Sequence, residues 1–381
     1  MSFDVAIVGA GPGGAAAAVA LAQLGITNVA LLDREGFPRD KTCGSGLSPN
    51  ALKLINSLGI GDEVKRLGYP INAVRIVTPG GRELNISSDA AATVLLRRHF
   101  DHLLVERATK LGVKLDTPFR ADAILEDGGR VRGVKSFDGR EIEAKYVLFA
   151  DGAHSMFSLD KRPKRSISTL MGWWENFESA PNTLDMIFDK DVAPLYGWMF
   201  PETNERVNIG ICVDGQDESG EKSTKNLRVT FENFLERHYG SRLKNAKQLG
   251  KWKGHPIVFT TWIGEMTRPG ALYLGEAARI THNATGEGIS QAMESGMFAA
   301  EAIASVLKKG VTEEKAWGAY VQRHRVRFTG AFIAGHALRA VIDSSMLDNV
   351  ADVYNQPLVR KLVVKLLGSA LAGSTVNERA V

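Results

Sequence analysis

A glycine-rich turn close to the N-terminus has the residue types and spacing that bind a dinucleotide. Gly9, Gly11 and Gly14 form a Gly-x-Gly-x-x-Gly pattern between a short apolar strand and an alanine-rich helix. In such a pattern the first glycine permits a tight turn, the second leaves room for a pyrophosphate, and the third allows close packing of helix on strand. The turn also contains Pro12 and Gly13, and the N-terminus of the following helix offers unpaired N–H groups to the phosphates.

An acidic residue stands where such a site needs one. Asp33 follows a second apolar strand over 29–32 and lies 19 residues after Gly14. A carboxylate in this place accepts hydrogen bonds from the hydroxyls of the adenosine ribose. A lone glycine pattern is a weak signal, but strand, helix and acid together predict a dinucleotide site. At this point the dinucleotide is either NAD or FAD.

The composition argues against several other classes of protein. The chain has 381 residues, of which 44% are hydrophobic and 24% charged, as in globular proteins with a large core. A net charge of +4 without a basic and aromatic cluster argues against a nucleic-acid partner. Cys43 and Cys212 have no metal-ligand spacing, so we expect a reducing, cytoplasmic setting and no bound metal. No uncharged apolar run is long enough to span a membrane.

The order of strands and helices predicts an α/β fold with a second sheet. Asp-Gly turns separate expected strands over 121–125, 131–136 and 141–149. Residues 167–212 alternate between apolar and polar side chains and are rich in aromatic ones, which predicts antiparallel strands of another sheet. From Thr285 onward, small residues recur every four positions, so we expect a long helix that approaches the sheet or the cofactor very closely.

Several further motifs occur in a characteristic order. An Asp-Gly pair stands at Asp151 and Gly152, and a Gly-Glu pair at Gly275 and Glu276. The others are Lys-x-Cys-Gly-x-Gly-Leu over 41–47, Arg-x-x-Phe-Asp over 97–101, Tyr-x-Trp-x-Phe-Pro over 196–201 and Thr-Gly-Glu-Gly-Ile over 285–289. Together with the glycine turn they cover about residues 1–305. In this order they resemble FAD-dependent oxidoreductases of the aromatic hydroxylase superfamily, and within it the geranylgeranyl reductase family.

This resemblance implies FAD as the cofactor. It implies that the glycine turn holds the pyrophosphate, Asp33 the adenosine ribose, and Arg97 the phosphate and ribitol side. It also places these residues at the cofactor: Arg34, Cys43, Gly44, Asp151, Gly152, Gly275, Glu276, Gly286, Gly288 and Ile289. The chain departs from the pattern where Glu276 replaces an aspartate, one methylene shorter, and where no proline precedes the glycines near Asn283.

Three side chains are candidates for catalysis beside the flavin, which carries the redox chemistry. Cys43 lies in a loop that the family places over the flavin ring, where it either contacts flavin or substrate or is only a small residue of the turn. Tyr196 and His282 are candidate proton donors, although a loop histidine that faces solvent is the alternative for His282. Aromatic residues expected to line a substrate pocket, or else to belong to the core, are Trp173, Trp174, Tyr196, Trp198 and Phe200.

We therefore expect three parts in the chain. They are a Rossmann-like FAD-binding domain over 1–72, 92–165 and 265–310, a substrate-binding sheet domain over 73–91 and 166–264, and a helical C-terminal region over 311–381. In the last region, separate helices are expected over 314–327, 330–344 and 357–370. The helix after Pro357 has a broad apolar face, opposite Lys361 and Lys365, made by Leu358, Val359, Leu362, Val363, Leu366 and Leu367. Such a face either packs on its own domain or makes a peripheral contact with a membrane.

The resemblance implies that FAD reduces a carbon–carbon double bond of a small apolar, isoprenoid-like substrate. A flavin monooxygenase that hydroxylates an aromatic ring, and a flavoprotein electron carrier to a quinone or redox protein, stay open as alternatives. The segment Gly172–Glu175 does not match the tryptophan motif of flavin halogenases, which disfavours halogenation. Because the chain has no second glycine fingerprint, NAD(P)H or another reductant is expected to bind only transiently.

Overall fold

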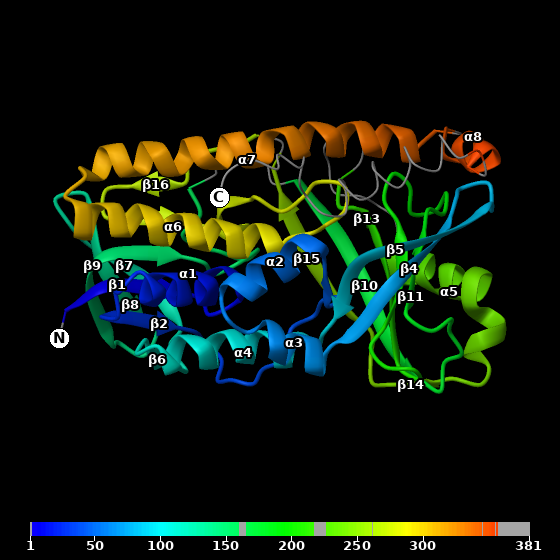
Figure 1. The fold of residues 1–381 in the computed structure, drawn as a ribbon, viewed down its shortest axis with the longest axis horizontal. Helices are drawn as coiled ribbons and strands as arrows, with labels where there is room; N and C mark the ends of the chain where they lie inside the picture. The colour runs from blue at the N-terminus through cyan, green and yellow to red at the C-terminus, as the bar shows by residue number, and fades with distance from the viewer. Residues whose placement is uncertain are drawn as a thin grey trace.

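The computed structural model describes residues 2–159, 165–216, 226–260, 262–344, 346–354 and 356. Two sheets lie side by side in an elongated molecule, and helices α6 (Ile289–Lys309) and α7 (Glu313–Ile342) run along one side (Figure 1). Helix α7 is long enough to extend from the first sheet to the second. The two sheets therefore share a common cover.

The first sheet is built mostly of parallel strands. Its centre is β1 (Phe3–Val8), which pairs in parallel with β2 (Val29–Leu32) on one side and β9 (Glu141–Phe149) on the other. The outer strands are β6 (Lys114–Asp116), β17 (Ala271–Tyr273) and β16 (Thr267–Arg268), and an antiparallel pair, β7 (Ala121–Asp127) and β8 (Arg130–Ser136), continues from β9. Strands covered on both faces are largely apolar, which explains the apolar run over residues 5–8 of β1. The predicted Rossmann-like α/β fold is confirmed.

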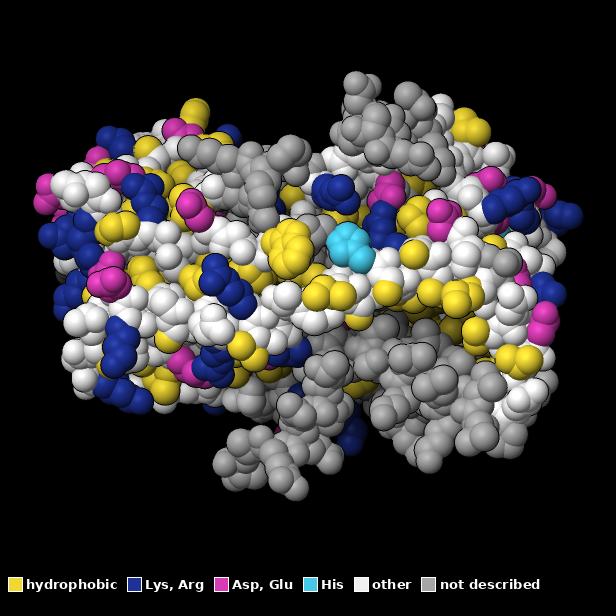
Figure 2. Space-filling view, turned by 90° about the horizontal axis from the view of Figure 1, so that it is seen from above, with side chains coloured by type: hydrophobic (Ala, Val, Ile, Leu, Met, Phe, Trp, Pro, Cys, Tyr) yellow, Lys and Arg dark blue, Asp and Glu magenta, His cyan; other side chains and the backbone are white. Residues whose placement is uncertain are grey.

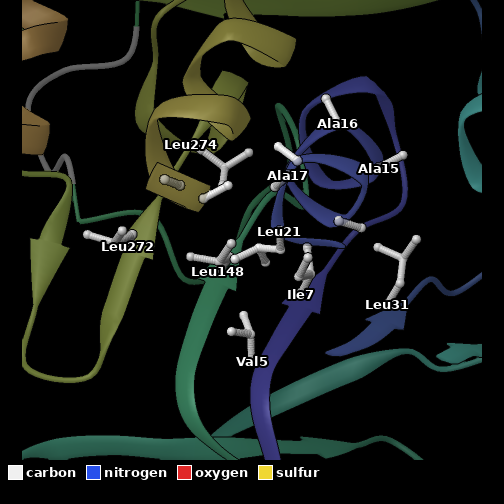
Figure 3. Close-up of a cluster of buried hydrophobic side chains, with 14 of the residues drawn as sticks. Val5, Ile7, Ala15, Ala16, Ala17, Leu21, Leu31, Leu148, Leu272 and Leu274 are labelled. Atoms are coloured by element: carbon white, nitrogen blue, oxygen red, sulfur yellow. The ribbon is translucent and has the colours of Figure 1, made fainter. Parts of the chain in front are cut away.

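Small side chains allow helix α1 (Pro12–Gln23) to pack between this sheet and α6. Ala15, Ala16 and Ala17 are fully buried, and they lie above Ile7 and Leu148 of the sheet (Figure 3). A Cβ atom at Gly296 of α6 would lie only 2.2 Å from the carbonyl oxygen of Gly13. The small-residue helix is thus closely packed, but the backbone that it meets at Gly296 is that of α1 and not that of the predicted sheet.

The second sheet has nine strands and contains the aromatic segment. Its order is β14 (Lys247–Gln248), β10 (Arg165–Glu175), β13 (Val207–Asp214), β12 (Gly197–Pro201), β11 (Thr183–Ile187), β4 (Tyr69–Val77), β5 (Glu83–Val94) and β3 (Gly46–Leu47), with β15 (Lys253–Phe259) also paired to β10. The expectation of antiparallel strands holds except for the parallel pair of β4 and β11. These two strands come from distant segments of the chain rather than from one hairpin, so a parallel pairing is open to them.

The two faces of the second sheet have different neighbours. Helix α5 (Leu227–Leu243) covers one face, where Phe231, Phe234 and Tyr239 are buried. The opposite face carries Met186 and Trp198 in another apolar cluster. Because side chains alternate along a strand, each residue of β10 to β13 belongs to one of these two faces and not to both.

The remaining helices are short, apart from α4 (Arg97–Lys110), which connects β5 of the second sheet to β6 of the first. The others are α2 (Pro49–Ser57), α3 (Gly61–Leu67), the 3-10 turn η1 (Gly275–Ala278) and α8 (Met346–Val353). Ser48 caps α2, since its hydroxyl oxygen accepts a hydrogen bond from the Ala51 N–H at 3.2 Å. Helix α7 is continuous, which corrects the expectation of separate helices over 314–327 and 330–344. A single glycine, Gly330, weakens a helix without ending it when tertiary packing supports the helix.

Candidate active site

A cavity of about 790 Å³ lies between the two sheets and is the setting for almost all of the predicted site residues. Its walls come from the glycine turn, the loop over residues 39–46, strands of the second sheet and the N-terminal end of α6. We call residues 39–46 the Cys43 loop. Polar residues around Asp33 form one part of the lining, and apolar and aromatic side chains of the second sheet form the other.

The glycine turn has the geometry that a pyrophosphate requires. Gly9 has a φ of +100°, and a Cβ atom there would lie 2.4 Å from the carbonyl oxygen of Ala150. At Gly14 an added Cβ would lie 1.9 Å from the Gly9 carbonyl oxygen. In contrast, a Cβ at Gly11 would meet only the Arg39 guanidinium at 3.8 Å, so the space in front of Gly11 is open. Two glycines therefore allow the turn to form, and the third leaves the cradle clear at the start of α1.

Backbone N–H groups of the glycine turn and of Glu35 fix the carboxylate of Asp33. Its Oδ2 accepts a hydrogen bond from the Ala10 N–H at 2.8 Å, and its Oδ1 accepts one from the Glu35 N–H at 3.0 Å. Each carboxylate oxygen keeps further lone-pair capacity toward the cavity. Arg34 also lines the cavity, although its side chain is mostly exposed and lies near Glu35. The position of Asp33 fits the expected hydrogen bonds to a ribose.

One buried carboxylate, that of Asp101, holds two arginines that line the cavity. Asp101 is fully buried and accepts hydrogen bonds from Arg97 at 2.7 and 2.8 Å, while Arg39 lies 3.2 Å from its Oδ2. Burial alone would lower the pKa of Arg97, but the Asp101 carboxylate outweighs this effect and raises the pKa. Arg39 was missed by sequence reasoning, because an arginine in a Gly- and Pro-containing loop has no pattern that distinguishes it from a surface residue.

The Asp-Gly and Gly-Glu motifs meet at the same cavity. Burial raises the pKa of Asp151 to about 6, and its Oδ1 atom is buried without a hydrogen-bond partner in the described part of the chain. Glu276 accepts a hydrogen bond from the Val258 N–H at 3.0 Å, and burial raises its pKa as well. An orphaned buried carboxylate oxygen beside open space fits a polar ligand that would supply the missing donor. The longer side chain of Glu276 is anchored to β15.

The Cys43 loop packs on the aromatic strand β12. A Cβ atom at Gly44 would lie 3.1 Å from the Phe200 ring and 3.2 Å from Nε1 of Trp198, so a larger residue would require these rings to shift slightly. Cys43 is half-buried, lines the cavity and accepts a hydrogen bond from the Ser45 N–H at 3.3 Å. The structure therefore places Cys43 at the wall of the cavity between the two sheets.

Three of the five aromatic candidates line the cavity. Tyr196 donates a hydrogen bond to the Thr285 carbonyl at 2.5 Å, Trp198 donates one to Asn208 at 2.7 Å, and Phe200 packs beside them. Burial raises the pKa of Tyr196 well above its ordinary value. We call Tyr196, Trp198 and Phe200 the aromatic wall of the cavity. The hydrogen bond of Tyr196 to Thr285 joins this wall to the loop before α6.

Trp173 and Trp174 do not line the cavity, which corrects that part of the prediction. Trp174 lies on the face covered by α5, with its ring 6.4 Å from that of Phe231. Trp173 points to the other face but lies beyond the cavity, where its indole N–H donates to Glu202 at 3.0 Å. Adjacent residues of a strand face opposite sides, so the pair could not have lined one pocket together.

His282 lies neither in the cavity nor in solvent, so the proton-donor prediction and its solvent-facing alternative are both wrong. The ring is buried, and burial lowers its pKa to about 4, which keeps it neutral at pH 7. Its Nδ1 accepts a hydrogen bond from the Thr285 N–H at 3.2 Å, and its Nε2 donates to the Ala331 carbonyl at 3.2 Å. His282 therefore fixes the loop whose Gly286, Gly288 and Ile289 do line the cavity. Because of this loop, α6 begins at Ile289 and not at Thr285.

Comparison with known proteins agrees with this geometry. The family described as "FAD binding domain" matches residues 2–329. The chain belongs to this family. The predicted cofactor, FAD, is therefore confirmed, and the open pyrophosphate cradle and the orphaned Asp151 oxygen fit it. The protein is an FAD-dependent oxidoreductase.

Relatives confirm the resemblance to geranylgeranyl reductases. A digeranylgeranylglycerophospholipid reductase of Methanosphaerula palustris is 28% identical over 86% of this chain and 83% of its own. The enzyme of the same name from Thermoplasma volcanium is 26% identical over 97% of this chain and 96% of its own.

Solved structures show the same fold. A geranylgeranyl bacteriochlorophyll reductase-like protein from Thermoplasma acidophilum gives a TM-score of 0.83 at 23% identity, with 97% of this chain and 96% of that chain covered. A flavin-dependent brominase gives 0.79 at 21% identity, with 97% and 94% covered. Reductases and other flavin enzymes therefore share this architecture, and fold alone does not choose between them.

The described residues contain no helix long and apolar enough to cross a membrane. Within the same residues there is no cluster of metal-ligating side chains. Seen from above, apolar side chains lie among basic and acidic ones on the outer face (Figure 2). The helix predicted after Pro357, with its choice between packing and membrane contact, lies outside the described residues.

Proposed function

We propose that this protein is a reductase that uses FAD to saturate a carbon–carbon double bond in an apolar, isoprenoid-like substrate. The observation that carries the proposal is the apolar part of the cavity lining. Beside the aromatic wall it consists of Ile76, Ile86, Met171, Leu184, Met186 and Ile257. An elongated hydrocarbon gains about 25 cal/mol for each Å² that such walls remove from water. The names of the archaeal relatives support a prenyl chain as the substrate.

The residues of this chain have separate tasks in that reaction. The glycine turn and the start of α1 would hold the pyrophosphate, and Asp33 the adenosine ribose. Arg97, fixed by Asp101, would face the phosphate and ribitol side. Reduced FAD supplies hydride when it is bound. Tyr196 and the Cys43 loop orient the alkene and keep water away from it, and Cys43 or a water molecule donates the proton.

The electron donor in this proposal is a molecule that the protein does not hold permanently. The described residues contain a single glycine fingerprint, so we propose that NAD(P)H or another reductant binds transiently. An exchangeable donor needs access to the cavity, and that access must close or be filled when the apolar substrate is bound. The substrate and the donor can therefore take turns at the same opening.

An anaerobic single-turnover experiment tests the proposal. Chemically reduced holoenzyme is mixed without oxygen with geranylgeraniol, and with the fully saturated alcohol of equal length as a control. We expect the absorbance of oxidised flavin to return only with the alkene, and the product mass to rise by two hydrogens. Product that gains an oxygen atom in air, with no anaerobic turnover, would support the monooxygenase alternative. Reoxidation by a quinone alone would support an electron carrier.

A further inference from the structure

Lys41 is a half-buried ammonium group at the cavity, and no acidic side chain of the described residues is in contact with it. Its Nζ lies 2.8 Å from Nε2 of His255, on strand β15. Among the described residues, Glu276 and Cys43 act on it only at longer electrostatic range, and Arg97 and Arg39 oppose its charge. An ammonium group removed from water is costly unless an anion or strong acceptors surround it. The cavity therefore has an unfilled requirement for negative charge at this point.

His255 accepts the hydrogen bond from Lys41 and is neutral. A lysine ammonium has only donors, so Nε2 of the imidazole must be the acceptor and Nδ1 carries the proton. Burial and the nearby charge of Lys41 lower the pKa of His255 to about 4, in agreement with this tautomer. The pair thus has one positive charge and one imidazole N–H that can point to a ligand.

A second histidine completes the group on the solvent side. The ring of His154 meets that of His255 edge-on, with the centroids 5.3 Å apart, and His154 is exposed. It follows the Asp151–Gly152 motif, whereas Lys41 comes from the Cys43 loop. All three side chains line the cavity. Segments from three distant parts of the chain therefore bring nitrogen donors together where the cavity meets solvent.

We propose that Lys41, His255 and His154 bind the phosphate or diphosphate of a molecule that enters the cavity beside FAD. The inference rests on the proposed function, which it deepens by assigning a site to the charged end of a ligand. The pyrophosphate of FAD itself belongs at the open cradle before Gly11, next to Arg39. An incoming phosphate has two sources, the headgroup of a prenyl substrate or the pyrophosphate of a nicotinamide dinucleotide. Both need the same donors.

Binding to oxidised holoenzyme tests the site without any turnover. Calorimetric titrations compare geranylgeranyl diphosphate with geranylgeraniol, which has the same chain and no phosphate. If the substrate is the source, wild type binds the diphosphate more tightly, and Lys41→Met weakens that binding about 10- to 100-fold, leaving the alcohol unchanged. Lys251→Met removes an exposed charge near the same strand and serves as the control, with no expected change. Failure of alkene reduction would not affect this measurement.

A second experiment tests whether the phosphate belongs to the nicotinamide dinucleotide. NADPH is mixed anaerobically with oxidised holoenzyme, and the concentration dependence of flavin reduction gives its apparent dissociation constant. A 10- to 100-fold rise in Lys41→Met for NADPH alone would assign the site to the dinucleotide. Unchanged affinity for both probes would overturn the proposal. So would loss of FAD from Lys41→Met with retention in Lys41→Arg, because Lys41 would then serve the phosphate of FAD. His255→Leu, which leaves the lysine in place, provides an independent variant with the same expected direction.

Discussion

Asp101 and Arg97 form a buried ion pair with two parallel hydrogen bonds, at 2.7 and 2.8 Å, one helical turn apart on α4. The carboxylate is fully buried, and its Oδ2 also lies 3.2 Å from Arg39. Through one acid, the fold sets the direction of two cations toward the polar part of the cavity lining. Residues that never touch a cofactor can therefore decide how well it is held.

Replacement of this acid should therefore damage both stability and cofactor binding. Asp101→Asn leaves Arg97 buried without its counterion, for which we expect a loss of about 3–5 kcal/mol in the free energy of unfolding. FAD occupancy should fall in the protein that still folds. Denaturant titration and the flavin absorbance of purified protein measure the two effects. Glu106→Gln removes a half-buried acid of the same helix whose carboxylate contacts the surface-side ring of His102, and it should change neither of them. Equal behaviour of the two variants would contradict the role of Asp101.

The contact of α6 with α1 gives a second prediction. Gly296→Ala would place a Cβ atom 2.2 Å from the Gly13 carbonyl oxygen, so α6 must move away from the glycine turn. We expect a loss of about 1–3 kcal/mol in stability and weaker FAD binding. Gly318→Ala on α7 meets nothing within 4 Å and should stabilise the protein by up to about 1 kcal/mol. If the two variants have equal stability, helix approach is not limited by this contact.

Glu276 tests whether the Gly-Glu motif is a cofactor ligand. Glu276→Asp keeps the charge and restores the usual length of the family, so we expect FAD to stay bound. Glu276→Ala removes the acceptor of the Val258 N–H and any hydrogen bond to the ribitol, and FAD affinity should fall about 10-fold or more. Fluorescence titration of apoprotein with FAD measures both values. Full affinity in Glu276→Ala would show that the role implied by the resemblance is wrong here.

The buried histidine of the loop before α6 makes stability depend on pH. The pKa of His282 is about 4 in the folded protein and ordinary in the unfolded chain, so only the unfolded chain gains this proton between about pH 6.5 and 4. The free energy of unfolding should fall as the pH drops through this window, by up to about 1.4 kcal/mol per pH unit for each such histidine. His324 and His255 have lowered pKa values as well and add to the slope. Denaturant titrations give the free energy of unfolding at pH 7 and at pH 5. The difference between these two values should be smaller for His282→Asn than for wild type, and an equal difference would argue against a neutral buried ring.

Binding of a phosphate at Lys41 should depend on pH in the alkaline range. Burial, together with Arg97, lowers the pKa of Lys41 to about 8, while Cys43 and Glu276 act in the other direction and Arg39 adds to the lowering. The ammonium form is present below this pKa, so affinity for a diphosphate should decline as the pH rises through about 8. Calorimetry at pH 7 and 9 measures the change. Lys41→Arg, which stays charged at both values, should remove the decline.

Several features could be predicted from the sequence because they depend on neighbours in the chain. The turn from Gly9 to Gly14 needs its backbone freedom wherever it is placed, and Ser48 caps α2 through a residue three positions away. The order of the motifs resembles that of one flavoprotein family, so the cofactor and the fold class could be predicted from it. Within β10 to β13, the alternating pattern predicted strands correctly.

Other features depend on contacts that no local pattern encodes. Lys41 meets His255 across 214 positions of sequence, and Arg39 finds Asp101 from another element. The register of β10 and the position of α5 likewise decided which face of the sheet Trp174 occupies. His282 is buried by contacts with Thr285 and Ala331, and Ala331 is distant in the sequence. Sequence determined which residues could form a flavin site. Tertiary packing decided which side chains face the cavity, since burial and long-range partners set both direction and charge.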